Sequence, residues 1–179
     1  MKKTIIFGMF LTASLFIFNS CGGDLQKNIV GKWTADLSSL EVTLGDGIPG
    51  DIKPEVESGV KEVKSMQFLA EQVTIDFKDG GVLTLGPTGD TKDFNWKVDG
   101  NNIVLSGELE GQKFEFSIEA KESSADKIVL YISAESALEQ MKKIMGAEFD
   151  QAMGELPPGV DINTMVKGTS ASMTLKKKA

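Results

Sequence analysis

Apolar and polar residues alternate along most of the chain between residues 71 and 132. The stretch 73–77, for example, is apolar at its odd positions and polar between them. A period of two indicates a strand with one buried and one exposed face. The remaining strands are expected at 29–37, 82–85, 94–98, 103–109, 114–120, 127–132 and 171–175. The pattern therefore predicts about eight strands.

Short turns separate most of these strands. Residues 78–81 read Lys-Asp-Gly-Gly and residues 99–101 read Asp-Gly-Asn, both typical of tight hairpins. Strands joined by short turns pair antiparallel, because parallel strands need long crossovers. A meander of this length must also protect its edge strands, and closure into a barrel does so. We therefore predict a mainly β fold, an antiparallel up-and-down eight-stranded barrel.

Two stretches change to a helical period and predict helices inserted at about 54–70 and 135–153. The first stripe is approximate and consists of Val56, Val60, Val63 and Phe68. The second recurs every three or four residues, at Leu138, Met141, Met145, Phe149 and Ala152. Methionines make adaptable apolar surface, so the second helix is either a structural cap on one barrel end or a lid over a pocket. A loop around 164–166 is expected to follow it.

The first twenty residues have a different pattern. Two lysines precede an apolar run from Thr4 to Phe18, and a short polar step leads to Cys21, the single cysteine. A run of this length is typical of a secretory signal and is shorter than the roughly 20 residues of a spanning helix. An ordinary signal peptide with a free cysteine and a short membrane anchor are the alternatives.

The segment Phe18-Asn19-Ser20-Cys21 resembles the lipobox of bacterial lipoproteins, which are cleaved before a cysteine that carries a diacylglyceryl group. The resemblance implies a signal peptide at 1–20, a lipidated tether at 21–28 and one domain at 29–179. Acyl chains on Cys21, palmitate among them, would attach the protein to a membrane. This lipobox is a loose match, and in that respect it resembles the lipoboxes of Bacteroidota lipoproteins. The resemblance implies a lipid anchor in the cell envelope, in the outer membrane of a Gram-negative bacterium.

Composition narrows the chemistry. The chain has no His, and all 19 basic residues are Lys. These absences exclude an imidazole base, His metal ligands and bidentate guanidinium clamps. We therefore expect no enzyme and no cofactor. The residues Asp46, Asp51 and Glu55 could offer oxygens to Ca²⁺, but their spacing fits no calcium loop, so we expect a solvated loop and no metal site.

The net charge of −7 at pH 7 also bears on partners. Removal of the leader would take away Lys2 and Lys3 and make the chain more acidic still. An acidic chain is a poor binder of nucleic acid through charge, so none is expected as a partner. The expected contacts are a membrane through the N-terminal lipid and a small apolar ligand, while a protein partner stays unknown.

The opening Gly31-Lys32-Trp33 resembles the Gly-x-Trp with which lipocalin and lipocalin-like proteins begin their first strand. The segments 77–84 and 94–105 resemble the small lipocalin-like lipoproteins of Bacteroidota, with a strand, an Asp-Gly turn and a strand. The resemblance implies a lipocalin-like barrel in which Gly31 and Trp33 form a structural end. Lipocalins proper place a late Arg over this Trp. This chain has no Arg, so a lysine of the last strand could cover Trp33.

An eight-stranded barrel has room for its own side chains or for one small ligand. The inward-facing set is large and mostly apolar, which suits a hydrophobic guest and equally suits a filled barrel. The candidate lining residues are Ile75, Phe77, Leu83, Leu85, Phe94, Trp96, Phe114, Phe116, Ile118 and Leu130. The leading prediction is non-catalytic binding of a small hydrophobic ligand.

The alternative function is an envelope structural or interaction lipoprotein with a filled barrel, which binds a protein or glycan partner. A large uncovered apolar patch on the helix at 135–153 would favour this alternative. An enclosed apolar cavity with one mouth would favour ligand binding.

Overall fold

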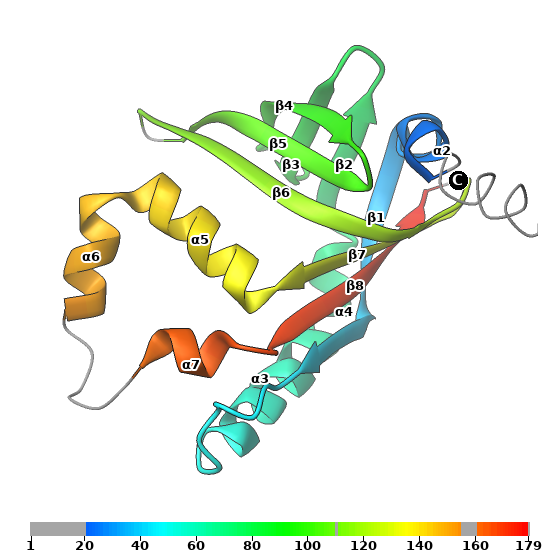
Figure 1. Ribbon diagram of the computed structural model, residues 1–179. Coiled ribbons are helices and arrows are strands. Elements are labelled where there is room, and N and C mark those ends of the chain that lie inside the picture. The colour runs from blue at the N-terminus through cyan, green and yellow to red at the C-terminus, as the bar shows by residue number, and fades with distance from the viewer. Residues whose placement is uncertain (1–20, 110, 155–160, 179) are drawn as a thin grey trace, which may run out of the picture.

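The computed structural model describes residues 21–109, 111–154 and 161–178. Its strands form one closed antiparallel barrel, in which each strand pairs with the next and β1 pairs with β8 (Figure 1). The predicted eight-stranded up-and-down barrel is therefore confirmed. The strands are β1 (Gly31–Thr43), β2 (Val73–Lys78), β3 (Val82–Pro87), β4 (Lys92–Asp99), β5 (Asn102–Leu109), β6 (Gln112–Ser123), β7 (Lys127–Ser133) and β8 (Ser170–Lys177).

The hairpin turns depend on glycines with positive φ. Gly80 and Gly81 have φ angles of 93° and 84° between β2 and β3, and Gly100 has 60° between β4 and β5. Glycine reaches this region at little cost, whereas side chains with a Cβ are strained there. The turns expected from the Asp-Gly pairs are confirmed, and the first of them places Phe77 opposite Leu83.

Side chains fill the barrel at the end where β1 begins. Phe77 and Trp96 meet edge to face, with ring centroids 5.4 Å apart. The Trp96 Nε1 donates to the carbonyl oxygens of Lys78 (3.2 Å) and Val82 (3.1 Å), so its one polar group is satisfied. The buried residues of this filled end are Trp33, Phe77, Leu83, Trp96, Ile103, Ala120, Ile128 and Leu175.

A helix plugs the filled end. Residues 21–28, expected to be a polar tether, form α2 (Cys21–Asn28), and the first strand begins at Gly31 rather than at residue 29. Leu25 is 1% exposed and Ile29 is fully buried. The Ile29 carbonyl accepts a 2.6 Å hydrogen bond from Trp33 Nε1, which ties the plug to the core. This helix has no apolar stripe, because Leu25 is the only large apolar residue between 22 and 28.

Both predicted helical insertions are present, and each is broken in two (Figure 1). Met66 separates the halves of the first, and Gly146, with φ of 55°, separates those of the second. Positive-φ glycine commonly ends a helix. One prediction is wrong, because 164–166 lie in a short helix capped by the Asp161 side chain rather than in a loop. These helices are α3 (Lys53–Ser65), α4 (Gln67–Ala70), α5 (Ala134–Met145), α6 (Ala147–Gly154) and α7 (Ile162–Val166).

A glutamine joins the first insertion to the backbone of β1. Pairing between β1 and β2 runs from Gly31 to Trp33 on the β1 side. Beyond it, the Gln67 side-chain amide in α4 donates to the Ala35 carbonyl oxygen (3.1 Å) and accepts from the Leu37 N–H (2.6 Å). The amide thus supplies the two hydrogen bonds that a neighbouring strand would make.

Gln140 of α5 does the same for β6. Pairing with β7 starts at Glu119, and Ser117 lies just before it. The Gln140 Oε1 accepts from the Ser117 N–H, while its Nε2 donates to the Ser117 carbonyl oxygen (3.1 Å) and the Ser136 Oγ (3.1 Å). Gln140 is only 8% exposed, so these bonds fix α5 against the edge of β6.

An irregularity in β1 lets this strand extend beyond the filled end. Its register with β8 shifts between Asp36 and Glu41. Here the Asp36 carboxylate forms an ion pair with Lys176, with an N–O distance of 2.7 Å. The Ser39 Oγ accepts a hydrogen bond from the Thr174 N–H (2.8 Å). The hydrogen bond from Lys176, followed by that from Ser38, lowers the pKa of Asp36. Side chains therefore replace the ladder bonds lost at the bulge, and β1 continues to Thr43.

Candidate functional site

The barrel interior divides into a filled end and a hollow mouth. Three predicted lining residues, Phe77, Leu83 and Trp96, lie in the filled end, where each is at most 4% exposed. They pack on one another and line no cavity among those described. Ile75 is half-buried against the same core and pairs with Trp33 on one side and Leu85 on the other. These four residues therefore have a structural role.

The mouth, opposite α2, contains an apolar cavity of about 320 Å³. Its wall is almost entirely aliphatic and aromatic, with one amide at the start of β6. This mouth cavity is lined by Leu85, Phe94, Leu105, Gln112, Phe114, Phe116 and Ile144. Four of the predicted lining residues are thus brought together: Leu85, Phe94, Phe114 and Phe116.

Two rings shape the wall of the mouth cavity. Phe94 and Phe114 meet edge to face with centroids 5.5 Å apart. Gly107 of β5 lies beside both, and a Cβ there would come within 2.9 Å of Phe94 Cδ1 and 3.3 Å of Phe114 Cε1. The absence of a side chain at Gly107 therefore makes room for the two rings.

Three lining residues were missed by the sequence-based prediction. Leu105 lies at an inward position of a predicted strand, so its period-two pattern could have identified it. Gln112 lies beside a turn, where the alternation of apolar and polar residues does not indicate which face of the barrel a side chain occupies. Ile144 comes from α5, and its contact with the barrel depends on where Gln140 fixes that helix. No local pattern could have placed Ile144 there.

A second apolar cavity, of about 190 Å³, lies farther along β6. The two remaining predicted residues, Ile118 and Leu130, line this side cavity. It adjoins the mouth cavity along β6, because Phe116 and Ile118 occupy successive inward positions. Its lining is completed by Leu40, Tyr131, Ile132, Ala171, Ser172 and Met173.

Gly31, Trp33 and Lys177 lie together at the filled end, where β1 begins. Trp33 is fully buried, and the Lys177 Nζ lies 5.3 Å from its ring centroid, within cation–π range. Gly31 has φ of 127°, and a Cβ there would approach Lys177 Cε to 2.9 Å. The close contact explains why glycine precedes this Trp by two residues.

The methionine-containing stripe of the second insertion is largely covered. Phe149 is buried and Leu138 and Met145 are half-buried, whereas Met141 is 46% exposed. Among the side chains of this stripe that the structure describes, three of four face the protein, so these residues do not form the large uncovered patch that would favour a docking helix.

Charged groups lie outside the two cavities. Neither lining includes an ionisable side chain other than Tyr131. Asp46, Asp51 and Glu55 are exposed, and among the described residues no three His, Cys, Asp or Glu side chains gather as a metal site. In α5, Glu135 accepts from the Gly168 N–H (2.9 Å), and this bond lowers the pKa of Glu135. That contact joins α5 to the turn before β8.

Cys21, the candidate lipidation site, is the first residue of α2. Within the described segments of the chain, no helix has the length and apolar character to cross a membrane. Comparison with family models, with curated proteins and with solved structures found no match to this chain.

Proposed function

We propose that this chain is a lipid-anchored envelope lipoprotein whose barrel binds a small hydrophobic ligand without catalysis. The observation that carries the proposal is the mouth cavity, an apolar space of about 320 Å³ with one amide at its rim. Ligand sites are typically about 300–1,000 Å³, mostly apolar, with a few polar groups that orient the guest. A cavity at the lower end of this range suits a compact apolar molecule or one acyl chain.

The α5 helix serves this function as a fixed cap. Gln140 holds the helix to Ser117 of β6, and Ile144, about one turn farther along, reaches the mouth cavity. In Figure 1, α5 lies beside β6 on the side away from α2. The helix therefore completes the wall of the cavity and leaves the ligand to enter around it.

The proposed anchor also orients the barrel. The α2 helix is eight residues long, about 12 Å, and packs Leu25 into the filled end. Acyl chains on Cys21 would hold that end near the bilayer, and the mouth cavity would face away from it. A ligand could then reach the mouth without crossing the anchoring membrane.

The anchor is tested by Cys21→Ala in the native host. We expect loss of palmitate labelling and a shift from the membrane fraction to the soluble fraction, since a thiol is the acyl acceptor. Ser20→Ala is the matched control, because it keeps the thiol and a small residue before it, and should stay in the membrane fraction. A Cys21→Ala chain that remained membrane-bound would show that another feature anchors the protein.

The cavity is tested with N-phenyl-1-naphthylamine, a neutral apolar dye that brightens in apolar surroundings. Ile144→Trp should fill the mouth cavity from α5 and weaken dye binding to the full chain at least about tenfold, or about 1.4 kcal/mol. Met141→Trp is the matched control, since it adds the same indole at an exposed position of the same helix. Its dye affinity should stay near that of the wild type.

Two results would count against the cavity as a binding site. One is a wild-type chain that binds no dye, and the other is equal weakening by Ile144→Trp and Met141→Trp. Native mass spectrometry of the purified chain, followed by lipid extraction, complements the dye. A reproducible small apolar molecule at one per chain is the expected result.

A further inference from the structure

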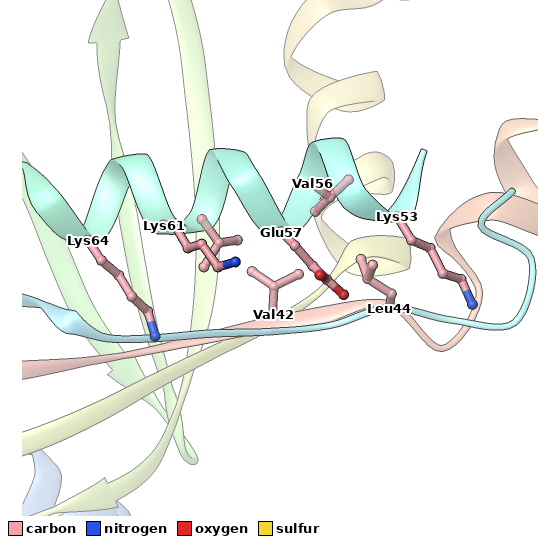
Figure 2. A pocket seen from close by; sticks show the side chains of 8 residues that line it. Val42, Leu44, Lys53, Val56, Glu57, Lys61 and Lys64 are labelled. Atoms are coloured by element: carbon pink, nitrogen blue, oxygen red, sulfur yellow. The ribbon is translucent and has the colours of Figure 1, made fainter. Parts of the chain in front are cut away.

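A third recess lies outside the barrel, between α3 and the far end of β1. Figure 2 shows Val42 of β1, and Leu44 just after the end of this strand, pointing toward α3. The helix contributes Val56 and Val60, and the recess has a volume of about 420 Å³. The lining of this α3 groove is Val42, Leu44, Lys53, Val56, Glu57, Val60, Lys61 and Lys64.

The rim of the α3 groove is positively charged, although the chain as a whole carries −7. Lys53, Lys61 and Lys64 extend from α3 toward β1 in Figure 2, and Glu57 is the one carboxylate among them. Within the described residues, ion pairs form at other lysines, and none joins these three to a carboxylate. Three ammonium groups against one carboxylate make this groove attractive to an anion.

The floor of the groove continues the inner surface of the barrel. Leu40, Val42 and Leu44 are half-buried, while Glu41 and Thr43 between them are exposed. Alternate residues of a strand share one face, and Leu44 follows directly after β1 in the same alternation. The three apolar side chains therefore form a track about 13 Å long. Leu40 also lines the side cavity, so one end of the track reaches the barrel interior. At the other end, Val42 and Leu44 line the α3 groove together with the three lysines.

We propose that the α3 groove binds the anionic headgroup of a single-chain amphiphile whose tail runs past Leu40 into the barrel. The lysines pair with a carboxylate or phosphate at the rim, and their methylene stems flank the chain below it. This inference rests on the proposed function, because the barrel interior must accept the tail. An acidic peptide fits less well, since it would leave the apolar track unused.

The test compares amphiphiles that share a chain and differ in the headgroup. Palmitate and palmitoyl lysophosphatidate are the anionic probes, and monopalmitin is the neutral one, each titrated below its micelle concentration against the full chain by native mass spectrometry. Replacing Lys53, Lys61 and Lys64 together by Gln should weaken binding of both anions about tenfold. Binding of monopalmitin should change less than about twofold.

A matched control removes three exposed lysines elsewhere, with Lys92→Gln, Lys97→Gln and Lys127→Gln. The control lowers the net charge equally, so anion binding should stay near wild type if the groove is the site. High salt should weaken binding of the two anions and leave binding of monopalmitin unchanged, because the Debye length falls to about 3 Å near 1 M salt. Thermal unfolding of both triple variants verifies that each is folded.

The outcomes separate this proposal from the one on which it rests. If the neutral dye and monopalmitin both fail to bind, the barrel takes no apolar guest and the proposed function fails. If monopalmitin binds but the groove variant binds anions as tightly as wild type, the headgroup proposal is wrong. Binding of anionic vesicles or an acidic peptide, without binding of palmitate or lysophosphatidate, would also overturn it.

Discussion

Trp33→Ala should lower the free energy of unfolding by about 3–5 kcal/mol, a large share of the roughly 5–15 kcal/mol that holds a domain folded. Trp33 is fully buried at the plugged end of the barrel. Its removal would leave a cavity and remove the 2.6 Å hydrogen bond to the Ile29 carbonyl oxygen. It would also remove the cation–π contact between Lys177 and the Trp33 ring. Each of these losses acts on the folded state alone.

Urea unfolding of the full chain, followed by far-UV circular dichroism, measures this loss. Trp33→Phe should cost less than Trp33→Ala, because it keeps a ring in the site and loses mainly the Nε1 hydrogen bond. Phe68→Ala is the matched control, since Phe68 is 60% exposed on α4 and its truncation should change stability by less than about 0.5 kcal/mol. Equal stability of Trp33→Ala and the wild type would mean that Trp33 does not lie in the core.

Leu25→Ala should destabilise the fold by about 2–5 kcal/mol, although it lies in a segment that looks like a polar linker. Leu25 is 1% exposed because α2 inserts it into the filled end of the barrel. Alanine has the higher helix propensity, so any loss must come from packing rather than from the helix itself. The result would make α2 part of the folded unit.

Gln26→Ala is the matched control for Leu25→Ala, because the adjacent side chain is exposed. It should leave the midpoint of urea unfolding unchanged within about 0.5 kcal/mol. If Leu25→Ala behaves like Gln26→Ala, the plug does not contribute to stability, and residues 21–28 act as the polar tether expected from the sequence. The slope of the urea dependence should be the same in all three chains, which keeps the comparison one of stability.

The strand order of the barrel could be predicted because its causes are local. Alternation assigns a face to each residue, and turns such as Asp79-Gly80-Gly81 join neighbouring strands antiparallel. When eight such strands follow one another, closure into a barrel pairs the first strand with the last and so leaves no unpaired edge strand. The barrel-end role of Trp33 did not come from alternation, because it was implied only by the resemblance of Gly31-Lys32-Trp33 to the lipocalin opening. In the structure Lys177 Nζ lies 5.3 Å from the Trp33 ring centroid.

The lining of the cavities could be predicted only in part. Phe77 and Phe116 have the same alternation and the same chemistry, yet the first is packed in the filled end and the second lines the mouth cavity. Their difference is the position along the barrel axis, which depends on strand register and on the plug. No local pattern reports either quantity.

The strands, the two insertions and an apolar interior could be read from the amino-acid sequence, because each follows from the period of neighbouring side chains, and the hairpins follow from the Asp-Gly turns between them. Which part of that interior is hollow depends on contacts that form only in the folded barrel. The plug is made by Leu25 reaching the core, and the mouth wall is completed by Ile144, which Gln140 positions through the backbone of β6. These contacts join residues far apart in the chain, and their energy depends on burial and geometry that exist only once the barrel has closed.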